Sequence, residues 1–292
     1  MIRILAAVFA GLLGLAFGSF LNVCLSRWPA GESVVSPRSH CRNCTHTLAW
    51  WENIPLLSWL ILHGHCRDCR TPISVRYPVV ELAVGVIWGV FAWQASGPSF
   101  ERLIISGFPL RGATLVLLKL TFYWLLVALA ALDVEHLWLP DWLTYTGIAL
   151  GILYVCTEFS FASHMFIMDH GLPYAIGLLL GGILIAAALI LIIRWLYKLI
   201  RHRDGLGLGD AKLMALLAAW LGLPGALLAF AIGVVLGAAI ALVLLINPAA
   251  RTNPQSWATS KLPLGTFLCV GGIVSSLWGQ PILAAYFRWA GF

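Results

Sequence analysis

Residues 113–132 read ATLVLLKLTFYWLLVALAAL, a run with Lys119 as its one charged residue, and Asp133 follows directly. About 20 apolar residues is the length that an α-helix needs to cross the hydrocarbon core of a bilayer. The whole chain has 292 residues, of which 61% are hydrophobic and 10% charged, whereas soluble domains average roughly 45–50% and 25%. This composition excludes a water-soluble globular protein and a disordered chain.

Several more apolar runs follow the same pattern and predict an all-α polytopic membrane protein with about eight transmembrane helices. The run 211–221 is short and ends at Gly222-Leu223-Pro224-Gly225, which is typical of a broken or re-entrant helix. The full set of runs is 4–25, 79–93, 113–132, 142–154, 175–196, 211–221, 226–246 and 262–277.

The positive charges predict the orientation, because loops rich in Lys and Arg stay in the cytoplasm. With the N-terminus outside and eight crossings, most of the 18 lysines and arginines fall on one side, which also carries the long polar insert 27–78. The net charge of +6 therefore reflects membrane topology. The basic residues are not clustered with polar aromatic residues as a nucleic-acid surface requires, so we expect a lipid bilayer and no nucleic acid as partner. The opposite side keeps Arg3, Arg102, Arg111 and Arg288.

The insert 27–78 holds two Cys-x-x-Cys pairs, Cys41 with Cys44 and Cys66 with Cys69. Two such pairs can close a tetrahedral thiolate cage around zinc, and the reducing cytoplasm disfavours disulfides. Four thiolates leave no open coordination position, so a structural zinc is predicted in preference to a catalytic one. Disulfides or free thiols are the alternative.

The tryptophan-rich segment 50–59 and Glu81 each allow a structural and a functional interpretation. The tryptophan-rich segment 50–59 suits the membrane interface, so it predicts an anchor that lays the zinc module on the bilayer; a wall of a substrate groove is the alternative. Glu81, just inside the second apolar run, either pairs with Arg76 or lines a site.

Two acidic residues at the predicted cytoplasmic ends of helices are candidate catalytic groups: Asp133, and Asp210 in Gly207-Leu208-Gly209-Asp210. Two carboxylates that share one site cannot both ionise easily, so one stays protonated as a general acid and the other activates water. This arrangement hydrolyses a peptide bond without a metal or a nucleophilic side chain. Gly207 and Gly209 let an extended substrate backbone approach the acid. A simple capping role for Asp210 is the alternative, and Asp141 is predicted to be a helix N-cap.

Other classes of protein fit less well. The chain has no G-x-S-x-G, no H-E-x-x-H and no P-loop, and we find no internal repeat. Acids inside a membrane also mark ion pathways, but here they lie at the ends of the runs. A polytopic transporter and a catalytically silent assembly scaffold with a zinc loop are the alternatives to an enzyme.

Over nearly its whole length the chain resembles the bacterial type IV prepilin peptidases, which are bifunctional leader peptidases and N-methyltransferases. The resemblance rests on several motifs in the family's order. They are Gly18-Ser19-Phe20-Leu21-Asn22-Val23, the two Cys pairs, Glu52-Asn53-Ile54-Pro55-Leu56-Leu57-Ser58-Trp59, Arg76-Tyr77-Pro78-Val79-Val80-Glu81, Asp133 with Leu139-Pro140-Asp141, and Gly207-Leu208-Gly209-Asp210-Ala211-Lys212.

The resemblance implies a multi-pass aspartic protease of the bacterial inner membrane with its active site at the cytoplasmic face. It implies that Asp133 and Asp210 are the catalytic pair and that Cys41, Cys44, Cys66 and Cys69 bind zinc. The implied substrates are type IV prepilins or type II secretion pseudopilins with type III signal peptides. The enzyme would cut after the glycine that ends a short basic leader, and then methylate the new N-terminal residue with S-adenosylmethionine.

The implied domain organisation has three parts. Residues 1–26 form the first transmembrane helix, residues 27–78 form the cytoplasmic zinc-binding loop linked to methyltransferase activity, and residues 79–292 form the transmembrane peptidase domain. The sequence does not identify the methyl-donor pocket, or the group that accepts the proton of the α-amine before its methylation.

Overall fold

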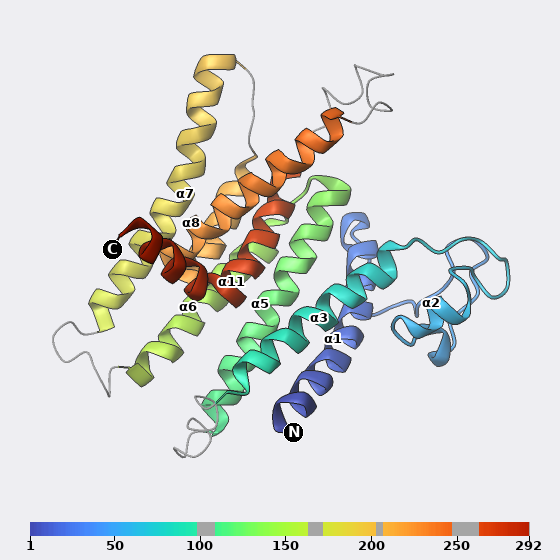
Figure 1. Ribbon diagram of the computed structural model, residues 1–292. Coiled ribbons are helices and arrows are strands. Elements are labelled where there is room, and N and C mark those ends of the chain that lie inside the picture. The colour runs from blue at the N-terminus through green and yellow to red at the C-terminus, as the bar shows by residue number, and fades with distance from the viewer. Residues whose placement is uncertain (98–108, 163–171, 203–206, 247–262, 292) are drawn as a thin grey trace. The chain divides into compact units, whose positions relative to one another are not determined.

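Helices form almost all of the regular structure in the computed structural model, which describes residues 1–97, 109–162, 172–202, 207–246 and 263–291 (Figure 1). Within these ranges no β-strand occurs, and the extended backbone is limited to isolated bridges between His40 and Thr47 and between His65 and Pro72. The predicted all-α architecture is confirmed. The long helices are α1 (Ile2–Arg27), α3 (Arg76–Ala95), α5 (Pro109–His136), α6 (Asp141–Ala162), α7 (Leu172–Arg201), α8 (Leu208–Ile246) and α11 (Leu264–Ala290).

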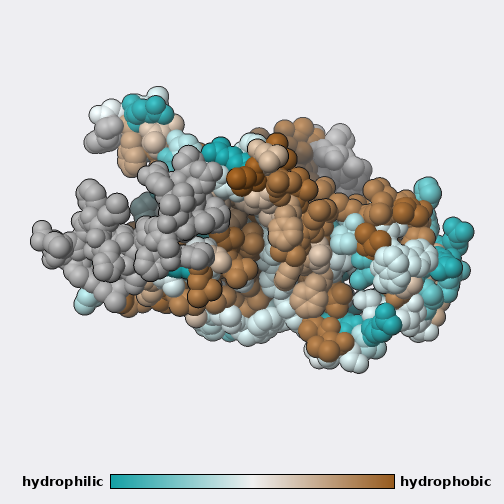
Figure 2. Space-filling view, turned by 90° about the horizontal axis from the view of Figure 1, so that it is seen from below, coloured by the Kyte–Doolittle hydropathy of each residue, from teal (hydrophilic) through white to brown (hydrophobic). Residues whose placement is uncertain are grey.

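Among the residues that the structure describes, six helices, α1, α3, α5, α7, α8 and α11, are long and apolar enough to cross a membrane. Figure 2 shows apolar surface over the helices and more polar surface where the insert 27–78 lies. Large apolar side chains on the outer faces, such as Leu184 and Ile200 of α7, are exposed. Such exposure is expected where the solvent is lipid and not water.

The chain divides into two compact units, Met1–Ala128 and Leu129–Phe292, and α5 runs from the first into the second. In the first unit, α1 and α3 are antiparallel partners that touch through small residues. A Cβ added at Gly14 would lie 2.9 Å from the Cα of Gly85, and one added at Gly18 would lie 2.7 Å from the Cα of Glu81. Small residues one turn apart let two helix backbones approach closely in a membrane.

Residues 28–75, which are called the zinc module below because of the metal site predicted from their cysteines, connect α1 to α3 in the first unit. It contains two short 3-10 helices, η1 (Trp28–Ala30) and η2 (Trp50–Asn53), and one short α-helix, α2 (Leu57–Ile61). Its other residues form turns and loops held by backbone hydrogen bonds. The module begins after the last residue of α1 and ends before the first residue of α3, so it packs on this end of the α1–α3 pair.

In the second unit, α8 is interrupted at Gly222, whose dihedral angles (φ 68°, ψ 174°) are available essentially to glycine alone. The first arm, Leu208–Leu221, runs parallel to α6. Near its start Lys212 contacts Asp141, and near its end the indole of Trp220 donates to the carbonyl of Gly147 at 2.8 Å. The break predicted from the sequence at Gly222 is confirmed.

The second arm of α8 returns toward the level at which the first arm began. It is antiparallel to α11: Gly237 lies against Phe267, and the carbonyl of Gly225 accepts from the hydroxyl of Ser275 at 2.8 Å. The predicted runs 211–221 and 226–246 are therefore two arms of one interrupted helix that reverses direction. The 14-residue first arm is about 21 Å long, which is less than the roughly 30 Å of a hydrocarbon core.

We expect Gly14→Ala to destabilise the first unit by about 1–3 kcal/mol, because the new methyl group must push the backbone of α3 away. The matched control is Gly181→Ala in α7, where nothing lies within 4 Å of an added Cβ. Both changes add the same methyl group to a helix interior, so the difference between them isolates the helix contact. Thermal unfolding in detergent measures it, and equal midpoints for the two variants would contradict the close α1–α3 packing.

Candidate functional site

Asp133 lies in the last turn of α5, where its side chain is buried with 5% of the residue exposed. The backbone N–H of Thr266 donates to its Oδ2 at 2.7 Å, and the hydroxyl of Thr266 lies 3.1 Å from the same oxygen. That hydroxyl is also 3.0 Å from the carbonyl of Ala130, one turn earlier in α5. Thr266 is in the first turn of α11, so the carboxyl group of one helix occupies the N-terminal, partially positive end of another.

Asp210 lies in the first turn of α8 and is 7% exposed. Its Oδ2 accepts the backbone N–H of Gly207 at 3.0 Å. This is the contact by which an acidic residue at the third helical position reaches back to the residue before the helix. The capping interpretation of Asp210 therefore describes its local geometry correctly. The same carboxyl group also lies in one site with that of Asp133.

The two acids come together around Leu139, in the turn between α5 and α6. Gly209 of α8 and Gly265 of α11 both pack against the side chain of Leu139. A Cβ added at Gly209 would lie 3.0 Å from Cδ1 of Leu139. A Cβ added at Gly265 would lie 3.1 Å from the same atom and 2.9 Å from Oδ2 of Asp133. The carboxyl groups of Asp133 and Asp210 are close enough to interact electrostatically. Residues 77 positions apart thus share one buried site, in which one carboxyl group can hold a proton while the other is charged.

Three residues of α11 near this site carry no signal that the sequence analysis used. Thr266 positions Asp133, Gly265 leaves room for its carboxyl group, and the side chain of Cys269 is fully buried near both acids. A backbone amide that donates to a distant carboxylate leaves no pattern in a sequence. The available signal was the pair Gly265-Thr266 at the start of an apolar run, at the membrane face predicted for both acids.

The predicted N-cap role of Asp141 is wrong. The carbonyl of Pro140 accepts the first helical hydrogen bonds, from Leu143 and Thr144, so the cap position belongs to Pro140. Asp141 is the first residue of α6, and its Oδ1 accepts a hydrogen bond from Nζ of Lys212 at 2.5 Å. This ion pair ties the start of α6 to the start of α8 beside the acid pair.

The four predicted metal ligands in the zinc module form one cluster, with all four sulfur atoms within 4.8 Å of one another. The Sγ atoms of Cys41 and Cys69 are 3.7 Å apart, and those of Cys44 and Cys66 are 3.9 Å apart. Four sulfurs at about 2.3 Å from a central zinc form a tetrahedron with edges of about 3.8 Å. The donor set and its spacing are therefore compatible with a structural zinc, and the described cysteines are free of disulfides.

The two halves of this cluster are copies of each other, so the prediction of no internal repeat is wrong for this segment. Residues 40–44 read HCRNC and residues 65–69 read HCRDC. In each half a backbone hydrogen bond closes a turn that begins at the first cysteine. The N–H of Thr45 donates to the carbonyl of Cys41 at 2.9 Å, and the N–H of Arg70 donates to the carbonyl of Cys66 at 3.1 Å. Thr45 and Arg70 also share a positive φ, of 59° and 58°. The repeat consists of two knuckles that present their thiols to one point.

Glu52, in the segment between the knuckles, joins the two halves. Its carboxyl group accepts from the N–H of Ala49 at 2.7 Å, lies 3.1 Å from Nε2 of His46 in the first knuckle, and lies 3.7 Å from Arg67 in the second. Burial disfavours the charged form, but the Ala49 amide, His46 and Arg67 outweigh it and hold the pKa of Glu52 below its usual value. His46 also contacts Asp68 at 2.9 Å.

The tryptophans of segment 50–59 have different surroundings. Trp50 is exposed on η2, as an interfacial anchor would be, whereas Trp59 lines a cavity and its indole donates to the carbonyl of Ile73 at 3.2 Å. Glu81 lines the same cavity, and its Oε2 accepts the N–H of Leu56 at 2.8 Å. Glu81 is not joined to Arg76, whose guanidinium stacks on the ring of Tyr77 at 4.8 Å.

Comparison with known proteins gives family matches in both parts of the chain. Residues 12–95 match the bacterial peptidase A24 N-terminal domain, and residues 120–242 match the type IV leader peptidase family. No solved structure shows a significant match.

Curated relatives align over almost the full chain. A "prepilin leader peptidase/N-methyltransferase" of Stutzerimonas stutzeri is 33% identical, with 95% of this chain and 92% of the relative aligned. A protein of the same name from Pseudomonas putida is 34% identical over 97% of this chain and 94% of the relative. A "type 4 prepilin-like proteins leader peptide-processing enzyme" of Escherichia coli O78:H11 is 31% identical over 92% of each.

We expect the purified protein to contain one zinc ion and the Cys41→Ser variant to lose it, because a neutral hydroxyl replaces one of the four thiolates. Cys156→Ser is the matched control, since Cys156 lies on α6 outside the cluster. Zinc per chain is measured by mass spectrometry of the metal. Full zinc content in the Cys41→Ser variant would rule out the four-thiolate site.

Proposed function

The chain belongs to the type IV leader peptidase family, and we propose that it cleaves the leader from prepilins with an aspartate pair, Asp133 and Asp210, and then N-methylates the new N-terminus. The observation that carries the proposal is the meeting of two buried carboxyl groups from α5 and α8 in one site, each held by a backbone amide. Prepilins and pseudopilins with type III signal peptides are the proposed substrates, cut after a glycine.

In the proposed hydrolysis, the charged carboxylate of the pair takes a proton from a water molecule as the water oxygen attacks the carbonyl carbon of the scissile peptide. The protonated partner donates to the carbonyl oxygen, which gives a tetrahedral diol. As the C–N bond breaks, the first carboxyl group gives the leaving amine the proton that it took from water, and the second carboxylate takes a proton back from a hydroxyl of the diol, which leaves a carboxylic acid. The pair ends with one proton, as it began. Gly207 and Gly209 keep the chain beside Asp210 free of side chains, so an extended substrate backbone has access there.

We propose that this site lies at the cytoplasmic face of the inner membrane. Its support is the excess of Lys and Arg on the side where α5 ends and where α8 and α11 begin. For the three segments 1–26, 27–78 and 79–292 we propose an anchoring helix, a zinc-ordered module that serves methyl transfer, and the peptidase domain. The zinc has a structural role, and S-adenosylmethionine is the methyl donor.

We expect Asp133→Asn and Asp210→Asn each to lower the rate of leader cleavage by about 10²–10⁴-fold, because an amide can neither take nor give the proton. Glu158→Gln is the control, at an exposed acid of α6 outside the acid pair. The assay uses purified full-length protein in detergent with a prepilin from the same organism, and mass spectrometry reads the loss of the leader. Wild-type turnover by either of the first two variants would exclude the pair as the catalytic groups.

Thr266→Val removes the hydroxyl near Asp133 and keeps the backbone N–H, so we expect kcat to fall about tenfold with little change in KM, because one neutral hydrogen bond is lost. Thr266→Ser should restore the rate because it restores the hydroxyl. A merely structural loss would not be rescued in this way. Equal kcat values for the Val and Ser variants would show that the hydroxyl does not position Asp133.

A further inference from the structure

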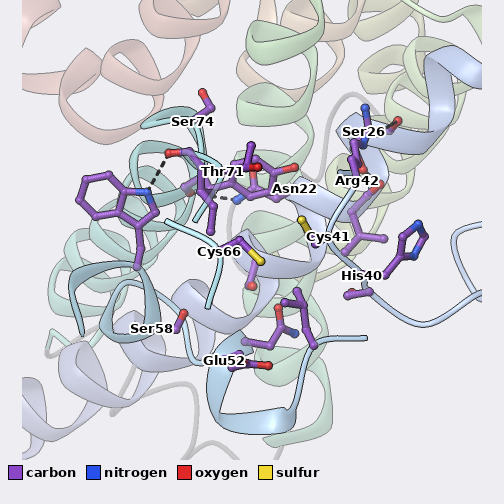
Figure 3. Close-up of a pocket in the computed structure, with 18 of the residues that line it drawn as sticks. Asn22, Ser26, His40, Cys41, Arg42, Glu52, Ser58, Cys66, Thr71 and Ser74 are labelled. Atoms are coloured by element: carbon purple, nitrogen blue, oxygen red, sulfur yellow. Dashed lines mark hydrogen bonds between the residues drawn. The ribbon is translucent and has the colours of Figure 1, made fainter. Parts of the chain in front are cut away.

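A cavity of about 820 Å³ lies within the first unit, between the zinc module and the end of the α1–α3 pair (Figure 3). Pockets that bind small molecules usually have volumes of about 300–1,000 Å³. The cavity is separate from the residues that form the acid pair, since all of its lining belongs to residues 19–81. Figure 3 shows Asn22, Glu52 and Cys66 around it.

One wall of the cavity joins three sequence motifs that have no part in the proposed peptidase. Ser19 and Asn22 come from the first, Tyr77 and Glu81 from the second, and Asn53 and Ser58, which lie on either side of Leu56 in the chain, from the third. The amide nitrogen of Asn22 donates to the carbonyl of Tyr77 at 2.9 Å, which joins α1 to α3. The N–H of Leu56 donates to Glu81, which joins the zinc module to α3.

The backbone at Leu56 is strained where it meets Glu81. Its dihedral angles are φ 60° and ψ −49°, and the N–H of Leu57 closes a three-residue turn onto the carbonyl of Pro55 at 2.6 Å. Turns of this kind are rare for residues other than glycine, and strained residues cluster at ligand sites. The carboxyl group of Glu81 accepts the N–H at the centre of this turn, and this hydrogen bond holds Glu81 in the wall.

Two acceptor groups of this wall have no positively charged partner among the described residues. Glu81 is buried, with 7% of the residue exposed, and within the described ranges it forms no ion pair. Oδ1 of Asn22 is also buried and has no hydrogen-bond donor. The other two acids of the lining differ: Glu52 is already bound by His46 and Ala49, and Glu32 is exposed. A buried carboxylate beside an unpaired acceptor favours a ligand that brings both positive charge and N–H donors.

The proposed function generates such a ligand. Leader cleavage frees an α-amine, and an α-amine has a pKa of about 7.7–8.0, so near neutral pH much of it is the ammonium form. The ammonium group must lose a proton before its nitrogen can attack a methyl group. The methyl-transfer step therefore needs a carboxylate that first binds this cation and then accepts its proton.

We propose that this cavity is the methyl-transfer site, and that Glu81 and Asn22 bind the α-ammonium group of the cleaved substrate, with Glu81 accepting its proton. The nitrogen lone pair then forms a bond to the methyl carbon of the sulfonium donor. The carbon–sulfur bond breaks, its electron pair stays on sulfur, and the products are a thioether and an N-methylammonium group. Glu81 afterwards releases its proton to water. This inference rests on the proposed function, because it needs a free N-terminus and a methyl donor.

The test separates methyl transfer from cleavage by use of a peptide that already lacks its leader. With full-length protein, this peptide and S-adenosylmethionine, we expect Glu81→Gln to lower the methylation rate by about 100-fold or more. The amide oxygen of Gln can still accept the N–H of Leu56, so the turn is retained. Leader cleavage by the same variant and its zinc content should match those of wild type. Glu158→Gln, at an exposed acid of α6, is the control.

Binding to the wild-type protein provides a readout that needs no variant and no turnover. We expect the leaderless peptide to bind at least tenfold more tightly than the same peptide with an acetylated N-terminus, as measured by fluorescence anisotropy. Glu81→Gln and Asn22→Ala should both reduce this preference. Equal affinities of wild type for the two peptides, or wild-type methylation by Glu81→Gln, would overturn the proposal while cleavage stayed intact. Absence of both cleavage and methylation in wild type would instead overturn the proposed function.

Discussion

The hydrogen bond from the backbone of Thr266 to Asp133 is the contact on which the second unit depends. A carboxyl group buried among apolar helices needs donors, because an unpaired one is costly. The donors here are the free amides at the start of α11, so α11 must begin where α5 ends. Since α8 also begins at this level with Asp210, the chain has to return to it before α11 starts. The reversal at Gly222 makes this possible, and a straight helix of the length of α8 would carry the chain to the other side.

The zinc module must also be held together, but it lies outside the membrane-spanning helices. Its segment of about 50 residues is too short to bury a core of its own, so buried polar contacts, together with the zinc proposed at the four cysteines, replace apolar packing. Two copies of the same knuckle supply two thiols each, and Glu52 holds the copies in register through His46 and Arg67. Glu81 then attaches the module to the membrane helices through Leu56. In both units a buried carboxylate sets how neighbouring segments meet.

The sequence was informative where a physical constraint leaves a local pattern. Apolar runs predicted the helices, Gly222-Leu223-Pro224-Gly225 predicted the break, and the rarity of acids in such a chain drew attention to Asp133 and Asp210. It was uninformative where the partner is a backbone group or lies far along the chain. Thr266 acts largely through its amide, and Lys212 meets an acid 71 residues away. The cap was misassigned to Asp141 because the carbonyl of Pro140, which any residue would provide, takes that role.

The two proposed reactions make opposite demands on acidic side chains. Hydrolysis needs two carboxyl groups near each other, so that one holds a proton, and α5 and α8 supply them. Methyl transfer needs a single carboxylate that is free to take a proton from a cation, which requires that no arginine or lysine neutralises it. Glu81 meets that condition because Arg76, five residues earlier, is turned onto the ring of Tyr77. The two sets of acids share no residue, so the chemistry of each can vary without the other. They are linked because the amine that hydrolysis releases is the nucleophile for methyl transfer.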